Sequence, residues 1–446
     1  MLAKVELGGY LLLGHMAGAA LSRAAARAKV VFWYIAGRSY FDMCAPQTMG
    51  SCRRLALGIS LLIYIGCGYV RHKPRTSADL LDRGIACFNN KDYDKAIDNF
   101  TEAIRLDPSN FNAFTCRTAA YRRKKDYDKA ISDFSQAIRM KPDDPVGRIN
   151  RADVYADIHQ HDKVIEDLIE AVRLDPNNAE AHTGLGVAYA AKRDYDKAIR
   201  EFTEAIRRDQ RYAVAYKCRA EAYFGKEEYD KAIDDVTESI RLNPNAPLTH
   251  ALRGQMYLHK KEYDKAIKDF TDAFQLDPNH ADAFVGRAVA YNGKKEYDKA
   301  IENYTEAIRL APKLPGPVGC RGIAYAAIEK YDKALKDFTE SVRLGESGAN
   351  ILDAFAWLSA TCPRDEVRDG KRAIELATRA CESSGWENAD YLETLAAAYA
   401  ERGNFKEALK WQEKATQLGP KKKADSQKRL KLYQSGKAYR DQLDGH

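Results

Sequence analysis

Few side chains in this 446-residue chain are placed to do chemistry, and the closest pair of histidines is His159 and His161. Imidazole nitrogens are common metal ligands, but a zinc site needs three or four protein ligands. The two histidines flank Gln160 in a short polar turn, and no third ligand stands beside them. The pair therefore indicates a solvated turn rather than a metal centre.

Two further motifs resemble ligand-binding loops but are incomplete. Gln434 to Lys437 (Gln-Ser-Gly-Lys) lacks the upstream glycine and the preceding strand of a phosphate loop. Asp92 to Lys95 (Asp-Tyr-Asp-Lys) begins like a calcium loop but lacks its glycine and terminal glutamate, and helix capping explains both aspartates. No Ser/His/Asp or Cys/His arrangement can be singled out by spacing. The sequence therefore predicts no enzyme, no cofactor and no metal.

The elements that carry these residues follow a strict internal repeat. The sequence that begins at Tyr93 (Tyr-Asp-Lys-Ala-Ile) returns at Tyr127 and, at multiples of the same spacing, as far as Tyr331 (Tyr-Asp-Lys-Ala-Leu). No residue is inserted or deleted between Ser77 and Gly348, so eight repeats of equal length fill this stretch.

Each repeat contains two helical patterns. The first runs about a dozen residues to an aromatic residue such as Tyr121, and the second forms an apolar stripe such as Ala96 to Ile104. A proline such as Pro108 ends the second helix. Glycine or alanine at the slot of Gly84 is expected to let the two helix backbones approach closely. Since one helix pair cannot bury both of its faces, the repeats must stack on one another.

The period, the tyrosine and alanine positions and the closing prolines resemble the tetratricopeptide repeat (TPR) family over residues 77–348. The resemblance implies an all-α fold, an α-solenoid in which antiparallel helix pairs stack into a right-handed superhelix. It also implies a non-catalytic scaffold that binds a protein or peptide partner in a concave groove lined by the first helices. The identity of that partner does not follow from the resemblance.

Beyond Gly348 the helical patterns continue less regularly. Residues 349–386 hold an irregular helix pair, because the loop from Pro363 to Gly370 is longer than the regular turn. Residues 389–422 return to the repeat. Residues 424–443 are expected to form a basic capping helix over the last apolar face.

The family resemblance places the ligand groove on inner positions of the first helices, whose mixed apolar and polar character suits an extended peptide or a helix. The lysine–asparagine set with which co-chaperone members clamp a carboxylate is absent, since Lys217 stands with Glu221. The predicted groove residues are Leu81, Ile85, Phe88, Arg122, Arg123, Ile149, Asp153, Val187, Lys217, Glu221, Phe224, Gln255, Leu258, Val289 and Asn292.

A column of arginines runs through the repeats, one residue before the small slot, beside two columns of acids. We interpret these columns as ion pairs that fix the register of the helices, because an arginine turned to an anionic ligand would leave the acids without partners. The arginines are Arg83, Arg117, Arg151, Arg219, Arg253, Arg287 and Arg321. One acidic column is Glu102, Glu170, Glu204, Glu238, Asp272, Glu306 and Glu340, and the other is Asp133, Asp167, Glu201, Asp235, Asp269 and Asp337.

Cys116, Cys218 and Cys320 occupy one slot in the second, fifth and eighth repeats. Stacked helices lie roughly 8–10 Å apart, whereas bridged cysteines need Cα atoms within roughly 7 Å. These cysteines are therefore predicted to be free. Unpaired cysteines throughout the repeats favour a reducing compartment.

Residues 55–70 contain no charged residue and lie between Arg54 and Arg71, which predicts a membrane segment. A helix needs roughly 17–25 apolar residues to span a bilayer, and the flanking arginines can extend this shorter run by snorkelling. One interpretation is a single-pass anchor. The other is a bacterial lipoprotein signal, in which Tyr64 to Cys67 resembles the lipobox and Cys67 carries the lipid. Residues 1–54 are expected to be poorly ordered or to contact the membrane.

The net charge of +7 is unevenly distributed. Residues 1–76 carry ten basic and two acidic side chains and residues 421–446 carry eight and three, so the repeats between them are acidic. An acidic body argues against nucleic acid as the ligand of the groove. Alternatives that stay open are an accessory subunit of an enzyme complex, a basic tail that binds nucleic acid or anionic lipid, and a cytoplasmic location.

Overall fold

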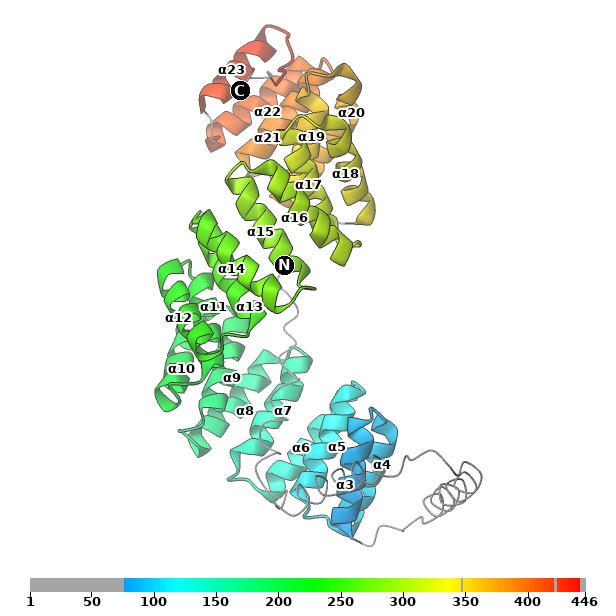
Figure 1. Cartoon of the computed structure of the whole chain (residues 1–446), viewed down its shortest axis with the longest axis vertical. Coiled ribbons are helices and arrows are strands. Elements are labelled where there is room, and N and C mark those ends of the chain that lie inside the picture. Colours follow the sequence, from blue (N-terminus) through cyan, green and yellow to red (C-terminus); the bar gives the residue numbers. More distant parts are fainter. Residues whose placement is uncertain (1–75, 346–347, 421–422, 442–446) are drawn as a thin grey trace, which may run out of the picture. The chain divides into compact units, whose positions relative to one another are not determined.

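The computed structural model describes residues 76–345, 348–420 and 423–441 (Figure 1). Every regular element in these ranges is a helix. By its internal contacts the chain divides into an N-terminal body, Met1–Ala188, and a C-terminal body, Tyr189–His446. The all-α fold of paired helices that the sequence predicts is confirmed.

The N-terminal body contains three complete repeats and the start of a fourth. Its helices are α3 (Ser77–Asn89), α4 (Tyr93–Leu106), α5 (Phe111–Arg123), α6 (Tyr127–Met140), α7 (Pro145–Asp157), α8 (His161–Leu174) and α9 (Ala179–Ala191), the last of which continues into the C-terminal body.

The C-terminal body begins with the rest of the fourth repeat and contains the fifth to eighth. Its regular helices are α10 (Tyr195–Arg208), α11 (Ala213–Gly225), α12 (Tyr229–Leu242), α13 (Pro247–His259), α14 (Tyr263–Leu276), α15 (Ala281–Gly293), α16 (Tyr297–Leu310), α17 (Pro315–Ala327) and α18 (Tyr331–Leu344). The later elements are α19 (Ala349–Thr361), η1 (Asp365–Val367), α20 (Gly370–Ser383), α21 (Ala389–Glu401), α22 (Phe405–Leu418) and α23 (Lys423–Gln434).

A three-residue turn joins the two helices of each regular repeat. In the first repeat Lys91 takes the left-handed conformation with φ 62°, and the carboxylate of Asp92 accepts the backbone N–H of Lys95 at 3.3 Å. This N-cap satisfies a donor that the second helix leaves unpaired, which starts α4 at Tyr93. The capping role predicted for Asp92 is therefore confirmed.

The core of each repeat combines buried alanines with one large side chain. In α4 the side chains of Ala96, Phe100 and Ala103 are all almost fully buried. The alanines let neighbouring helices approach, and the aromatic ring fills the space between them. The same arrangement in successive repeats produces a row of small cores rather than one large core.

The small slot of the first helix is shaped by that large side chain. A Cβ atom added to Gly84 would lie 2.3 Å from the ring of Phe100. The sequence had suggested that this slot lets two helix backbones approach, but the structure shows that it makes room for the ring. Glycine is not required beside every ring, because the slot holds Thr118 in the repeat of Phe134 and Ala288 in the repeat of Tyr304.

The last helices keep the spacing of the regular repeats, apart from one insertion. Helix α19 follows α17 at the same interval that separates α15 from α17, and α23 follows α21 at this interval too, so both start as first helices of a repeat. The insertion lies between α19 and α20 and contains η1. Helix α23 ends at Gln434, not at the predicted Leu443, because Gly436 takes a left-handed φ of 69° and turns the chain away.

No helix in the part of the chain that the structure describes has the length and apolar character needed to cross a bilayer. The predicted membrane segment, residues 55–70, lies outside the described residues, as do residues 1–54 and Cys67.

Candidate functional site

Several first helices of successive repeats lie close together. Contacts join α3 to α5 in the N-terminal body, and join α13 to α15, α17 to α19 and α19 to α21 in the C-terminal body, whereas no successive second helices described within either body are in comparable contact. Helices that approach more closely line the inner side of a locally curved stack. Positions 2, 5, 9, 12 and 13 of each thirteen-residue first helix share one side, which we call the first-helix face.

All fifteen predicted groove residues lie on first helices, at positions 5, 9, 12 or 13. Arg123, Glu221, Gln255 and Val289 are exposed, and the other eleven are half-buried. The prediction omitted position 2, where three large apolar side chains are exposed. These are Val146, Val214 and Leu248, of which Leu248 is 64% exposed. The helical period alone could have included them.

Arg122 is already paired within the N-terminal body. Its Nε lies 2.8 Å from Asp157 Oδ2, its Nη1 lies 3.5 Å from Asp153 Oδ2, and its side chain is 13% exposed. Both aspartates come from α7, the first helix of the next repeat. The guanidinium therefore joins two first helices, and its charge is neutralised on the face.

Asp153 is the acid of this group whose protonation is most perturbed. Burial raises the pKa of the Asp153 carboxyl to about 6, Arg122 acts in the opposite direction, and the negative charges of Glu180 and Asp157 add to the rise. The side chain is 35% exposed, so solvent reaches it from the face while protein encloses it elsewhere. This part of the face holds more negative than positive charge.

A second acid with a raised pKa lies on α11. Burial raises the pKa of the Glu221 carboxyl, and Lys217, whose Nζ lies 3.7 Å from Glu221 Oε1, partly offsets the rise. The two residues occupy positions 5 and 9 of one helix, so their pairing is local.

Three aromatic rings meet at one edge of the face in the C-terminal body. The ring of Phe224 lies 4.9 Å from that of His259 and 5.6 Å from that of Tyr229, and the rings of Tyr229 and His259 stack at 5.5 Å. The sequence predicted Phe224 alone, because Tyr229 and His259 belong to different helices, α12 and α13.

The arginine column is used for structure, as the sequence predicts. Arg219 donates to both carboxylate oxygens of Asp235 at 2.7 Å, and its third nitrogen donates to Thr203 Oγ1 of the preceding repeat at 3.1 Å. Each arginine of this kind therefore joins two second helices. The same double pairing occurs in Arg117–Asp133, Arg151–Asp167, Arg253–Asp269 and Arg321–Asp337.

Arg287 differs, because it donates to the amide oxygen of Asn303 at 2.7 Å instead of to a carboxylate. Without a carboxylate partner, burial lowers the pKa of Arg287.

The acids of the column that begins with Glu102 were predicted to pair with the arginine column, and this prediction was wrong. Most of them pair instead with arginines one turn further along their own helices. These pairs are Glu102–Arg105, Glu170–Arg173, Glu204–Arg207, Glu238–Arg241, Glu306–Arg309 and Glu340–Arg343.

One set of possible metal ligands occurs among the described residues, namely His250, Asp269 and Asp272. Asp269 already accepts two hydrogen bonds from Arg253, at 2.7 and 2.8 Å. A metal ion there would have to compete with a guanidinium for the same carboxylate, so the group does not resemble a metal centre. His159 and His161, whose rings lie 6.1 Å apart, belong to no such set within the described ranges.

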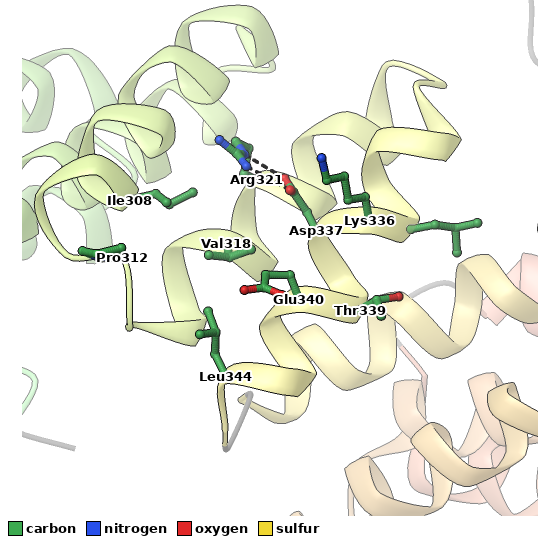
Figure 2. A pocket seen from close by; sticks show the side chains of 10 residues that line it. Ile308, Pro312, Val318, Arg321, Lys336, Asp337, Thr339, Glu340 and Leu344 are labelled. Atoms are coloured by element: carbon green, nitrogen blue, oxygen red, sulfur yellow. Dashed lines mark hydrogen bonds and ion pairs between the residues drawn. The ribbon is translucent and has the colours of Figure 1, made fainter.

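A pocket lies between α16, α17 and α18, away from the first-helix face (Figure 2). Val318, Leu344 and Glu340 line it, and the ion pair between Arg321 and Asp337 closes one side. None of the fifteen predicted groove residues lines this pocket. The guanidinium of Arg321 is already hydrogen-bonded to Asp337, so neither charged group of this pair is available to bind a ligand.

The fold and this face define an α-solenoid of helical repeats. Family comparisons match the tetratricopeptide repeat family at residues 80–110, 119–144, 152–193, 179–212, 247–280, 281–314 and 389–422. The chain is a tetratricopeptide repeat protein. Proteins of this family are usually non-catalytic scaffolds for protein or peptide binding.

Several solved structures are similar to this chain. YrrB, described as a TPR protein with an unusual peptide-binding site, is 26% identical over 40% of this chain and 92% of its own, with a TM-score of 0.35. A tetratricopeptide repeat protein from Parabacteroides merdae is 18% identical, covering 65% and 98%, with a TM-score of 0.44. Yeast Tom70 is 18% identical, covering 81% and 95%, with a TM-score of 0.37. The comparison with curated proteins finds no match.

Proposed function

We propose that this chain is a membrane-tethered scaffold of a bacterial type, which binds a protein segment on the concave side of a right-handed superhelix. The observation that supports this proposal most strongly is the exposure of apolar side chains on the first-helix face, where packing does not require them. Leu248 at position 2 of α13 is 64% exposed and Val289 at position 9 of α15 is 38% exposed. An exposed apolar row beside polar groups suits an extended peptide or an amphipathic helix.

The charge of the face favours a basic partner segment. At the five face positions of the described first helices, the C-terminal body carries Lys217 and Lys431 against a larger set of acids. These acids are Glu221, Asp282, Asp353, Asp390, Glu393 and Glu401, of which Glu393 and Glu401 are paired with arginines. Complementary charge mainly sets the rate and specificity of association, and apolar contacts supply the affinity. The preferred segment therefore combines apolar residues with lysine or arginine.

Two matched leucine substitutions test the binding face. Leu248→Asp places a charge on the face, whereas Leu276→Asp makes the same change at a leucine 40% exposed at the end of the second helix α14. A displayed peptide library should yield basic, apolar peptides whose affinity for the full chain falls at least tenfold in the first variant. The second variant should bind them normally, and both should keep the helical circular dichroism of the natural protein. Enrichment of acidic peptides, or equal binding by both variants, would contradict the proposal.

The proposed tether is the uncharged run at residues 55–70, supported by its composition and by the arginines on both sides. We expect the full chain to stay in the membrane fraction after alkaline extraction and a variant without these residues to be released. If Cys67 is instead a lipidation site, labelling with a fatty-acid analogue should occur and Cys67→Ser should abolish it. Protease treatment of intact cells then reports which side the repeats face. A full chain released by alkali and not labelled by lipid would refute both forms of tether.

A basic tail that binds nucleic acid or anionic lipid is the alternative proposal. This tail, residues 421–446, has fewer unpaired positive charges than its sequence suggests. Arg429 lies 2.6 Å from Glu393, and Arg440 lies 2.5 Å from Glu401, so both arginines are neutralised within the chain. If the tail does bind a polyanion, the affinity should depend steeply on salt and should be lost without residues 421–446.

A further inference from the structure

The chain turns back after its last helix and lies on the first-helix face of the C-terminal body. Helix α23 ends at Gln434, Gly436 takes a left-handed φ, and the N–H of Lys437 closes the turn on Leu432 O at 3.0 Å. The segment that follows, Ala438 to Asp441, has no regular secondary structure. We call it the C-terminal segment.

The end of this segment is held by α19 through both backbone and side chain. The N–H of Asp441 donates to Thr361 O at 3.0 Å. Its carboxylate accepts the indole N–H of Trp357 at 2.7 Å and shares the hydroxyl of Thr361, at 3.1 Å, with Trp357 O at 2.9 Å. A carboxylate that accepts from these groups while its own N–H is bonded is held in a defined position.

The two residues before Asp441 make specific contacts as well. Arg440 forms an ion pair with Glu401 of α21 at 2.5 Å, and Glu401 also accepts from Arg368 at 3.0 Å. The ring of Tyr439 lies 5.9 Å from that of Trp357. The aromatic residue and the aspartate therefore both meet Trp357, one at its ring and the other at its indole N–H, while the arginine between them meets Glu401.

The groups that hold the segment occupy face positions of two successive first helices. Trp357 and Thr361 are at positions 9 and 13 of α19, and Glu401 is at position 13 of α21. Asp153 and Asp157, which hold Arg122 in the N-terminal body, are at positions 9 and 13 of α7. The C-terminal segment thus uses the positions at which a partner is expected to bind.

We propose that Trp357, Thr361 and Glu401 form a peptide site for an aromatic–arginine–aspartate segment of a partner protein, and that Tyr439 to Asp441 occupy this site in the free chain as a competitor. This inference rests on the proposed function and specifies one part of the face. The indole N–H and the Thr361 hydroxyl select the carboxylate, the carbonyl of Thr361 takes the backbone N–H, and Glu401 selects the arginine. Exchange of arginine and aspartate would oppose like charges at Glu401, so the order of the residues matters.

Competition within one chain weakens a partner by a predictable factor. A short tether gives the C-terminal segment an effective concentration on the order of mM. If the C-terminal segment binds this site with an intrinsic dissociation constant of about 10 μM, a partner segment would therefore bind the full chain roughly 100-fold more weakly than a chain without the segment.

The test uses a labelled synthetic peptide with the sequence of residues 435–446 and follows its fluorescence anisotropy. The full chain is compared with a variant that ends at Lys437, which keeps α23 and the turn that closes it. The variant should bind the peptide at least tenfold more tightly than the full chain does. A control peptide in which the arginine and aspartate are exchanged should bind at least tenfold more weakly than the natural peptide.

Two substitutions in the shortened chain locate the peptide. Trp357→Phe removes the indole N–H and keeps a ring, and Thr361→Val removes the hydroxyl, so each should weaken the peptide about tenfold, as loss of a hydrogen bond to a charged group does. If one of them does not fold, as judged by circular dichroism, the other still tests the site. Leu276→Asp, at the end of the second helix α14 and off the first-helix face, serves as the second control and should leave the binding of this peptide unchanged.

The outcomes are distinct. Peptide binding to the shortened chain that depends on residue order and on Trp357 supports the proposal. No binding to the shortened chain, or equal binding to the full chain, overturns it. Concentration-dependent dimers of the full chain that the Lys437 truncation abolishes would assign the site to a second copy of this chain, which also overturns it.

Discussion

The pair formed by Arg219 and Asp235 allows a quantitative test of the arginine column. Their side chains are 17% and 10% exposed, and Arg219 makes two hydrogen bonds of 2.7 Å to the carboxylate. Asp235→Ala would leave a mostly buried guanidinium without a counter-charge, which costs about 3–5 kcal/mol in comparable cases. Because both groups keep some contact with water, we expect a loss of about 3 kcal/mol.

One repeat of this chain naturally has asparagine in place of the aspartate, which serves as a reference for a milder substitution than alanine. Arg287 and Asn303 occupy the equivalent positions in the seventh repeat, and the amide oxygen accepts from the guanidinium at 2.7 Å. Asp235→Asn should reproduce this arrangement and cost about 1 kcal/mol, the difference between a charged and a neutral acceptor. Replacing both partners by apolar residues, Arg219→Met with Asp235→Leu, should cost less than the alanine variant because no buried charge remains alone.

Hydrogen exchange of the amides in α11 and α12 is the appropriate assay, since stacked repeats need not unfold in one step. At tenfold per 1.4 kcal/mol, Asp235→Ala should speed the exchange of these amides roughly 100-fold, and Asp235→Asn about fivefold. The reasoning fails if the asparagine variant is as damaging as the alanine variant, or if the doubly apolar variant is the least stable of the three.

Three further predictions follow from single sites. Burial raises the pKa of Asp153 to about 6 from its ordinary value of 3.8, so the folded carboxyl binds a proton in this window that the unfolded carboxyl releases. The stability that this proton contributes is complete below the unfolded pKa of 3.8 and is lost as the pH rises through the folded pKa of about 6. The melting temperature of Asp153→Asn, relative to that of the natural protein, should therefore increase from pH 4 to pH 7. A melting-temperature difference that stays constant or shrinks over this range would contradict the prediction. Gly84→Ala should destabilise the first repeat by about 1–3 kcal/mol through overpacking, because its Cβ would lie 2.3 Å from the ring of Phe100. Phe100→Leu should recover part of this loss in hydrogen exchange of α3, and the account is wrong if the double variant is worse than Gly84→Ala. Burial raises the pKa of Cys218 and of Cys381 to about 12, so both thiols should resist alkylation at pH 8 in the native chain and react fully in denaturant, as mass spectrometry can measure. Rapid native labelling of Cys218 would show that this site opens.

Much of the fold could be predicted because the information is local and repeated. The regular return of Tyr-Asp-Lys-Ala-Ile specifies where each second helix begins, and the buried alanines of α4 lie on the stripe expected from the helical period. The end of α23 was mispredicted because charge and helix propensity favoured continuation to Leu443, whereas the left-handed conformation of Gly436 ends the helix. The groove residues at positions 5, 9, 12 and 13 were predicted from the resemblance to the tetratricopeptide repeat family, and the period of a helix places these positions on one side.

The sequence by itself determined the repeat, the helix pairs, the order of the small cores and the helix side that forms the first-helix face. Only the tertiary structure decided which of two equally spaced acids each arginine meets, that Arg122 is already paired with two aspartates, and that Asp441 lies against Trp357, 84 residues away in sequence. The physical reason is that a periodic pattern fixes the side of a helix on which a residue lies. The partner of a charged group depends instead on the distances between helices of different repeats, which arise only when the repeats stack.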